Sequence, residues 1–323
     1  MNSRGEDHYW PVPNFGKSGR LQAIMVREQL FVEASDSETL EQWGFRGYPD
    51  FLTPDGASEI SRVRDRTVYF LPPATPGKPG AYLKVFHNPG ANRPWLQLLH
   101  LEKPHSQAEA ESRRLLWLEQ HHFLAPRVMA WGARISGIRE INSFLLTEEL
   151  SGLEPMDVWL QQNEESPTAE RDSRLKRRFL QRCAEVLSSL HGQGFDHPFP
   201  YLRHFFVPSY AHCRDSSFHP AEEIPVAVLD VHCAEIRSSV SPRNRARALT
   251  EALISSLKSP LTQSDRLFFF SSYCGGQPDR KLLERVIKRL CVKMKRHPTR
   301  YRWVREKLLS MPFPESFRKL ADV

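Results

Sequence analysis

The secondary-structure pattern of the chain changes near its middle, and this change limits the folds it can adopt. The first half carries strand-like runs at residues 66–71 and 81–86, joined by a Pro- and Gly-rich connection typical of a hairpin loop. A helix that Ser106 can cap follows, and then two further strand candidates at residues 128–132 and 143–150. The second half is mostly helical in pattern. Strands followed by helices predict the α+β class with two lobes, a sheet-rich N-lobe and a helical C-lobe.

We expect three segments: a variable N-terminal extension at residues 1–45, the N-lobe at residues 46–150 and the C-lobe at residues 151–323. The hydrophobic content of 40% and the charged content of 26% exclude wholesale disorder. The sequence has no apolar run long enough to span a bilayer and no apolar leader at its start. Its five cysteines form no CxxC pair, which is typical of a reducing compartment. Together these features predict a cytoplasmic protein.

Lys84 stands in the middle of the apolar strand-like run at residues 81–86. A charge in such a place is costly unless an anionic group meets it. The alternative is an edge strand on which Lys84 faces water. The next helix offers Glu109 and Glu111 as ionic partners, and the sequence does not choose between them.

A polar loop and a strand-end aspartate follow in the second half. The helix predicted at residues 173–190 stops at glycines, and a polar loop then re-enters an apolar run near residue 205. Asp230 directly follows the short apolar strand at residues 225–229, where a carboxylate is well placed to hold a divalent cation. Strand lysine, helix glutamate, polar loop and strand-end aspartate, in this order, indicate kinase-like phosphoryl transfer.

These segments resemble the lipopolysaccharide kinase family, whose members phosphorylate heptose or Kdo sugars of the lipopolysaccharide inner core. The resemblance covers residues 60–295 and is carried by residues 82–87, 111–118, 126–132, 147–150, 204–207, 229–232 and 266–273. It implies a two-lobed protein-kinase-like fold and the use of ATP with Mg²⁺. It also implies that the acceptor is a sugar hydroxyl of lipopolysaccharide core or of a related glycolipid.

The resemblance assigns the nucleotide to residues of the first half. Lys84 would hold the α- and β-phosphates, and Glu111 would orient Lys84. The segment that resembles the family's hinge would meet adenine through its backbone groups, at Glu148, Glu149 and Leu150.

The second half would supply the metal site and the catalytic loop. Asp230 would bind Mg²⁺, and His204 stands where the broader kinase fold uses a metal-binding asparagine. Where the family has His-Arg-Asp, this chain has His-Pro-Phe ending at Phe199, which cannot accept a proton from the acceptor. Asp196 and His197 are the candidate substitutes for the missing base. An active sugar kinase and a pseudokinase that keeps the fold without phosphotransfer therefore both stay open.

Positive charge is concentrated at residues 280–307 of a chain with a formal charge of +7. Apolar residues at helical spacing accompany the basic ones, which predicts an amphipathic helix. Such a helix either lies on an anionic membrane, here the cytoplasmic face of the inner membrane, or docks on the core and exposes a basic face. Nucleic-acid binding is disfavoured because the sequence has no helix-turn-helix or zinc signature.

Overall fold

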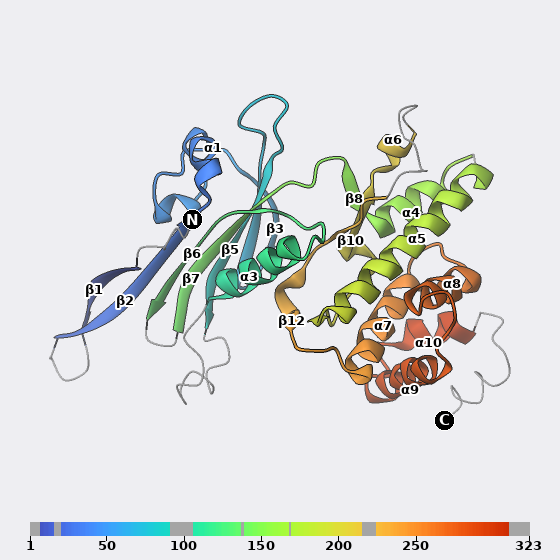
Figure 1. Cartoon of the computed structure of the whole chain (residues 1–323). Helices are drawn as coiled ribbons and strands as arrows, with labels where there is room; N and C mark the ends of the chain where they lie inside the picture. The colour runs from blue at the N-terminus through green and yellow to red at the C-terminus, as the bar shows by residue number, and fades with distance from the viewer. Residues whose placement is uncertain are drawn as a thin grey trace. The chain divides into compact units, whose positions relative to one another are not determined.

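The computed structural model describes residues 7–15, 21–90, 106–136, 139–167, 169–214 and 224–309 (Figure 1). The chain divides into two compact units, Met1–Ser151 and Gly152–Val323. The first unit is built around one large sheet, and the second is mostly helical. The chain therefore has the order of strands and then helices that the sequence predicts.

The first unit contains a seven-stranded antiparallel sheet in the order β1-β2-β6-β7-β5-β4-β3. Its strands are β1 (Asp7–Phe15), β2 (Leu21–Val32), β3 (Ser58–Val63), β4 (Arg66–Leu71), β5 (Ala81–Gly90), β6 (Val128–Ser136) and β7 (Arg139–Glu148). β5 pairs with β4 on one side and with β7 on the other, so it is an interior strand. Leu83 and Val85 of β5 are fully buried on one face, and Lys84 therefore points to the other face.

The N-terminal strands belong to this same sheet. β2 pairs with β6 in a register that runs from Val26 opposite Ser136 to Val32 opposite Ala130. Part of the segment expected as an N-terminal extension, residues 21–32, thus extends the sheet of the first unit. The helix α1 (Ser37–Gln42) follows β2.

Aromatic side chains fill the core beside the sheet. Phe51, at the end of the 3₁₀ helix η2 (Tyr48–Phe51), stacks on Phe144 of β7 with ring centroids 4.0 Å apart. Gly132 of β6 makes room for these rings, because a Cβ atom there would lie 2.6 Å from Phe144 and 2.9 Å from Tyr48. The close packing explains why β6 carries a glycine inside a strand.

The helix α3 (Gln107–Gln120) packs against β6 and β7 (Figure 1). The predicted cap is present, since Ser106 Oγ accepts a hydrogen bond from the Glu109 N–H at 3.0 Å. Leu115 and Leu118 bury the apolar side of the helix. The same helix carries Glu111, so its attachment to the sheet decides where that carboxylate lies.

The second unit consists of helices with short strands between them. Its helices are α4 (Met156–Glu164), α5 (Ala169–Gly192), α6 (Tyr210–Cys213), α7 (Pro242–Ser256), α8 (Gln263–Tyr273), α9 (Arg280–Arg296) and α10 (Arg302–Leu309). One small sheet has the order β11-β10-β8, from β8 (Leu153–Pro155), β10 (Phe205–Pro208) and β11 (Ala227–Val228). A second pairs β12 (Glu235–Ile236) with β9 (Phe195–Asp196).

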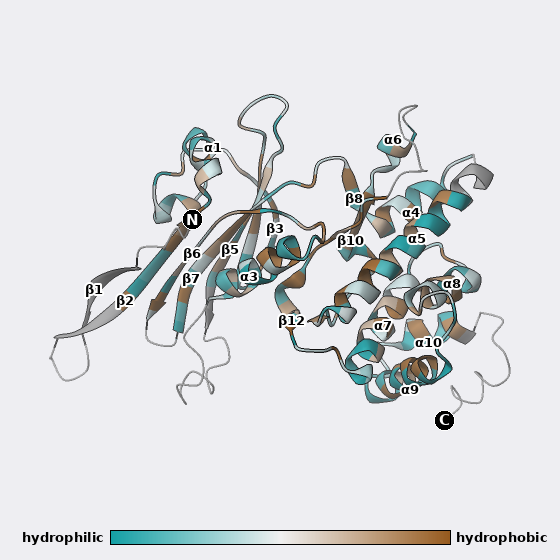
Figure 2. Cartoon of the chain, in the orientation of Figure 1, coloured by the Kyte–Doolittle hydropathy of each residue, from teal (hydrophilic) through white to brown (hydrophobic). Residues whose placement is uncertain are grey.

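The basic segment forms two helices rather than one, α9 and α10, separated by the turn at residues 297–301. Apolar residues of α9 such as Val286 and Leu290 are buried, whereas Lys281, Arg285 and Lys288 are exposed. Hydrophobic and hydrophilic residues thus share α9 (Figure 2). The helix is docked on the core and also presents a basic face. Within the described ranges, no helix has the length and apolar character needed to cross a membrane.

Candidate active site

Lys84 and Glu111 form an ion pair inside the first unit. Lys84 Nζ lies 2.6 Å from Glu111 Oε1, and the Glu111 side chain is only 2% exposed. Lys84 cannot face water from an edge strand, because β5 is interior. The second oxygen, Glu111 Oε2, is buried and makes no hydrogen bond within the described part of the chain. The pair therefore keeps a half-buried ammonium group in a fixed position.

Glu109, the other candidate partner of Lys84, points elsewhere. Its Oε1 accepts a hydrogen bond from Arg113 Nη2 at 2.6 Å, one turn further along α3. The choice between the two glutamates, which the sequence leaves open, is made by the direction in which each side chain leaves α3.

Glu140 holds the first turn of α3 against β7, a contact that sequence reasoning missed. Its Oε2 accepts the Gln107 N–H at 2.9 Å, and its Oε1 accepts the Ser143 hydroxyl at 2.5 Å. A carboxylate at a helix N-terminus accepts hydrogen bonds from free N–H groups and interacts favourably with the helix dipole. Burial raises the pKa of Glu140 to about 7, although the hydrogen bond from Ser143 opposes this shift. Glu140 thereby helps to place the helix that carries Glu111.

The segment that resembles a hinge is held by backbone and side-chain contacts. The Glu148 N–H donates to the Arg127 carbonyl and the Glu149 N–H donates to the Gly80 carbonyl, both at 2.9 Å. Glu149 Oε2 also accepts the Gly80 N–H at 3.0 Å, and Arg127 ion-pairs with Glu148. Leu150 follows directly and is partly exposed.

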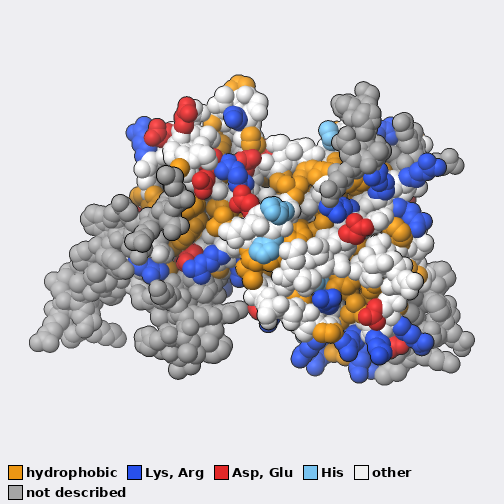
Figure 3. Space-filling model, viewed as in Figure 1, with side chains coloured by type: hydrophobic (Ala, Val, Ile, Leu, Met, Phe, Trp, Pro, Cys, Tyr) orange, Lys and Arg blue, Asp and Glu red, His pale blue; other side chains and the backbone are white. Residues whose placement is uncertain are grey.

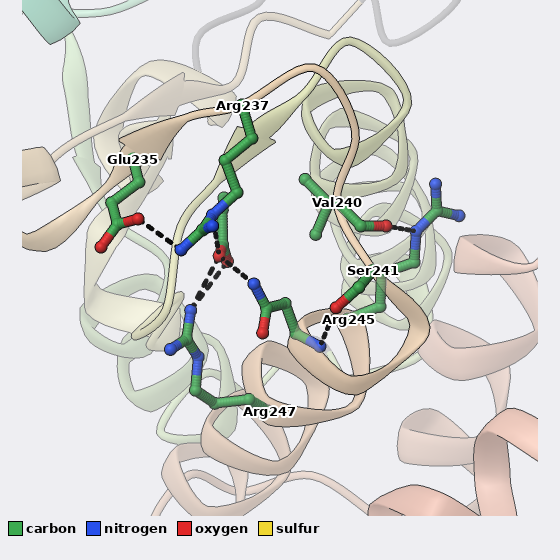
Figure 4. Close-up of polar contacts among 8 residues, drawn as sticks. Glu235, Arg237, Val240, Ser241, Arg245 and Arg247 are labelled. Atoms are coloured by element: carbon green, nitrogen blue, oxygen red, sulfur yellow. Dashed lines mark hydrogen bonds and ion pairs between the residues drawn. The ribbon is translucent and has the colours of Figure 1, made fainter.

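Asp196 lies in a buried ion-pair network of the second unit. It is fully buried, and it accepts hydrogen bonds from Arg237 Nε at 3.1 Å and Asn244 Nδ2 at 2.6 Å. Arg247 Nη2 lies 2.9 Å from each of its two oxygens. Figure 4 shows Arg237 and Arg247 pointing toward the same carboxylate. These contacts join the start of the loop predicted to be catalytic to α7 and to the segment after β12.

Gly194 makes this junction sterically feasible. It has a φ of +89°, and a Cβ atom there would lie 2.0 Å from the Arg237 carbonyl oxygen. The Arg237 N–H donates to the Gly194 carbonyl at 2.9 Å, next to the pairing of β9 with β12. Only glycine tolerates both the positive φ and the close approach of the backbone.

His197 and Phe199, in the loop predicted to be catalytic, have opposite environments. His197 is 1% exposed, and its ring nitrogens find no good hydrogen-bond partner among the described residues except a weak contact with the Leu229 backbone. Burial lowers the pKa of His197 to about 3, and the nearby His204 adds to that effect. Phe199 is 37% exposed and offers only its carbonyl oxygen, which accepts a hydrogen bond from His204 Nδ1 at 2.8 Å.

Asp230 lies between two imidazole rings. His204 Nε2 is 3.2 Å from Asp230 Oδ2, and His232 Nδ1 is 2.5 Å from Asp230 Oδ1. Asp230 adopts a left-handed conformation with a φ of 57°, an uncommon backbone that the surrounding contacts must hold. The hydrogen bond to Asp230 raises the pKa of His232 to about 10. His232 was not predicted as a site residue, although it stands two positions after Asp230 in the sequence.

The tautomer of His204 bears on whether this group fits a cation. Nδ1 donates to the Phe199 carbonyl, and Nε2 accepts from Arg203 Nε at 3.2 Å, so the neutral ring has its lone pair at Nε2. Burial lowers the pKa of His204, which favours this neutral form. The Arg203 guanidinium already donates to this lone pair, so His204 is not free to serve as a metal ligand. Because Mg²⁺ prefers oxygen ligands, Asp230 fits it better than His204 does.

The described residues do not form a complete metal cage. Nowhere in those ranges do three or more His, Cys, Asp or Glu side chains form a group able to hold a metal ion. This is compatible with Mg²⁺ chemistry, since Mg²⁺ in phosphoryl-transfer sites takes one or two carboxylates and completes its shell with phosphate oxygens and water. The single carboxylate of Asp230 therefore fits a metal that arrives with its nucleotide.

The fold of an antiparallel-sheet unit followed by a helical unit defines the chain as a kinase-like protein. It aligns with a solved structure titled "WaaP in complex with acyl carrier protein", with a TM-score of 0.57 and 23% identity over 83% of this chain and 96% of that one. A model of the lipopolysaccharide kinase (Kdo/WaaP) family matches residues 92–273. The chain belongs to this family, and the predicted fold class and family resemblance are both confirmed.

Two curated relatives carry the same name, lipopolysaccharide core heptose(I) kinase WaaP. The protein of Pseudomonas aeruginosa is 27% identical over 194 residues, which are 60% of this chain and 69% of that protein. The protein of Escherichia coli strain K12 is 30% identical over 141 residues, which are 44% of this chain and 49% of that protein. The match thus spans about half the length of the Escherichia coli relative.

Proposed function

We propose that the protein is a kinase that uses Mg²⁺ and ATP to phosphorylate a sugar hydroxyl of lipopolysaccharide core or a related glycolipid. The observation that carries this proposal is the ion pair between Lys84 and the buried Glu111. A lysine held in this way by a helix glutamate is a shared requirement of kinase-like phosphoryl transfer. Family membership and the curated relatives named heptose(I) kinase support the same substrate class.

The proposed roles follow the chemistry of each group. Lys84 would bind the α- and β-phosphates, and Glu111 would keep its ammonium in place. The backbone from Glu148 to Leu150 would meet adenine. Asp230 would supply the anionic ligand for Mg²⁺, with His204 beside it. When bound, Mg²⁺ neutralises charge on the phosphate oxygens.

The acceptor hydroxyl would be activated without the base that the family loop normally supplies. Use of Asp196 as a base would require its bonds to Arg237, Asn244 and Arg247 to break. Use of His197 would require a fully buried ring to reach the acceptor. Phosphoryl transfer is largely dissociative, so positioning and electrostatics account for most of its acceleration. A positioned general base adds about 10²–10⁴ in rate, and we expect a slow kinase.

The alternative is a pseudokinase that binds nucleotide and transfers no phosphoryl group. It is favoured by one observation, the partly exposed Phe199 at the position of the base. The two proposals differ in turnover and not in nucleotide binding.

A phosphotransfer assay tests the proposed activity. The purified chain is incubated with Mg²⁺, ATP labelled at the γ-phosphate, and lipopolysaccharide core acceptors that lack phosphate. We expect slow labelling that Lys84→Met abolishes and that Lys78→Met, a change at an exposed lysine of the same unit, leaves intact. Absence of labelling with every acceptor, together with intact ATP binding, would favour the pseudokinase.

A cavity in the second unit supports a further partner. It has a volume of about 200 Å³ and an almost wholly apolar lining, which includes Leu249, Leu253, Phe269, Val286, Leu290 and Met294. A solved structure of WaaP contains an acyl carrier protein. Because an apolar cavity of this kind fits a hydrocarbon chain, we propose that it receives an acyl chain delivered by an acyl carrier protein.

Calorimetric titration with acylated and unacylated acyl carrier protein tests this partner. We expect the acylated form to bind more tightly, and Leu253→Trp, which places a larger side chain in the cavity, to remove the difference. Val292→Trp is the control, because Val292 is exposed on α9 and does not line the cavity. Equal affinity for both forms would count against an acyl-binding cavity.

We also propose a peripheral location at the cytoplasmic face of the inner membrane. The support is the exposed basic face of α9 and α10, where Arg280 and Arg302 are at least 80% exposed. Such residues are attracted to anionic lipid and lose that attraction as salt rises. Sedimentation with anionic vesicles at increasing salt tests this location. Binding that does not depend on salt would contradict it.

A further inference from the structure

The helices α7 and α9 are fixed against each other by polar contacts. Thr250 Oγ1 of α7 donates to the Val286 carbonyl of α9 at 3.3 Å. Glu251 of α7 forms an ion pair with Lys293 of α9. The sides of the two helices that carry these residues are therefore adjacent.

Arginines extend along both of these sides. Arg243 and Arg247 are one turn apart on α7, and Arg289 and Arg296 are two turns apart on α9. Figure 3 shows Lys and Arg side chains gathering over α7 and α9. Arg289 lies close enough to the other three to be affected by their charges. Burial lowers the pKa of Arg289; Arg247, Arg243 and Arg296 add to this effect, and Glu251 opposes it.

Nearby carboxylates do not neutralise most of this cluster. Asp196 pairs with Arg247, and Glu251 pairs with Lys293. Arg243, Arg289 and Arg296 make no ion pair with any carboxylate in the ranges that the structure describes. The Nε atoms of Arg247 and Arg289 are buried and have no hydrogen-bond partner among those residues. Positive charges and unsatisfied hydrogen-bond donors thus lie close together, which is unfavourable unless an anion binds among them.

We propose that Arg243, Arg289 and Arg296 form a binding site for a phosphate ester group, with Arg247 behind them. Arginine suits this ligand because its planar fork donates two parallel hydrogen bonds to phosphate oxygens. The phosphate belongs to a lipid or glycolipid head group, because the cluster is continuous with the exposed basic residues of α9. The site is separate from the proposed phosphoryl transfer, and it adds local recognition to the diffuse attraction of a basic face.

Paired charge variants separate a site from diffuse attraction. The test variant is Arg289→Gln with Arg296→Gln, which removes two charges from the cluster. The matched control is Arg280→Gln with Arg302→Gln, which removes two charges from α9 and α10 at arginines already paired with Glu284 and Glu306. Both variants change the net charge of the basic face equally. ATP binding and the thermal unfolding midpoint are measured on each variant, so a failure of the fold or of the nucleotide site is seen directly.

Two probes identify the source of the phosphate. One is a vesicle of phosphatidylcholine with phosphatidylglycerol, compared with phosphatidylcholine alone, and the other is soluble glycerol 3-phosphate. We expect the test variant to lose at least about tenfold more affinity than the control for the mixed vesicles, as expected when charge-assisted hydrogen bonds are lost. Binding of glycerol 3-phosphate alone, lost in the test variant, supports a phosphate site but overturns its assignment to a lipid or glycolipid head group. Equal losses in the two variants, or no binding of either probe by the unaltered protein, overturn the proposal.

Discussion

The ammonium of Lys84 lies 2.6 Å from the Glu111 carboxylate, and that carboxylate has a second oxygen that is buried without a hydrogen bond. Glu111 is therefore satisfied on one side only, by Lys84. Removal of the lysine would leave a buried charge with no partner, so the pair is important for the fold of the first unit as well as for the proposed nucleotide site.

We predict that Lys84→Met destabilises the protein by about 3–5 kcal/mol, the usual consequence of breaking a buried ion pair from one side. Lys84→Met combined with Glu111→Gln should recover most of that loss, because no unpaired charge remains. Urea unfolding of both variants measures the difference. If the single and double variants unfold at the same urea concentration, the pair has no such structural role.

We predict a pH dependence of stability that is caused by Glu140. Burial raises its pKa from 4.5 to about 7, so between these values the folded state binds a proton that the unfolded state has lost. The free energy of unfolding should then fall as pH rises from 4.5 to 7, by about 3 kcal/mol for this group. Glu140→Gln removes the titration.

The measurement is urea unfolding at pH 4.5 and pH 7.5 for the unaltered protein and for Glu140→Gln. Other groups, such as His191 and His197 with pKa values lowered to about 3, contribute to both proteins and cancel in the comparison. The same dependence on pH in both proteins would show that Glu140 does not titrate in this range.

We predict that Phe199→Asp raises the rate of phosphotransfer by about 10²–10⁴, the usual contribution of a general base. Nucleotide affinity should not change. Phe199→Asn, which introduces a polar group that cannot accept the proton, is the control. If Phe199→Asp transfers phosphate no faster than Phe199→Asn, the site lacks more than the base.

We predict that Asp196 acts by holding the catalytic loop. Asp196→Ala leaves Arg247 without its carboxylate and should destabilise the protein by about 3–5 kcal/mol, whereas Glu164→Ala at an exposed position of α4 should have little effect. Asp196→Asn keeps an acceptor and should recover part of the loss. If Asp196→Asn abolished phosphotransfer with stability and nucleotide affinity unchanged, Asp196 would instead be the base.

The features predictable from sequence are local patterns. Lys84 and Asp230 stand out because each is a charged residue beside apolar neighbours, and Ser106 stands out as a cap. The role of Glu140 depends on its contact with Gln107, 33 residues earlier in the chain, which arises only when distant segments pack together. The contact of His232 with Asp230 is local in sequence, but it depends on the direction in which each side chain points.

Asp196 illustrates the same limit for the candidate site. Its position near the predicted catalytic loop suggests a base, because from the sequence alone the partners of a carboxylate can be judged only by how near they are along the chain. In the structure its partners Arg237, Asn244 and Arg247 come from 41 to 51 residues further along. The basic segment has the same limit. Its sequence shows an amphipathic pattern, but it does not show that α7 places Arg243 and Arg247 beside the basic side of α9.

Calorimetric titration of ATP, with and without Mg²⁺, shows whether Lys84 and Glu111 form a working nucleotide site. We predict Mg²⁺-dependent binding that is retained by Lys78→Met and lost by the folded double variant Lys84→Met with Glu111→Gln. Absence of ATP binding by the unaltered protein, or equal binding by all three proteins, would contradict the claim that Lys84 and Glu111 form a working nucleotide site.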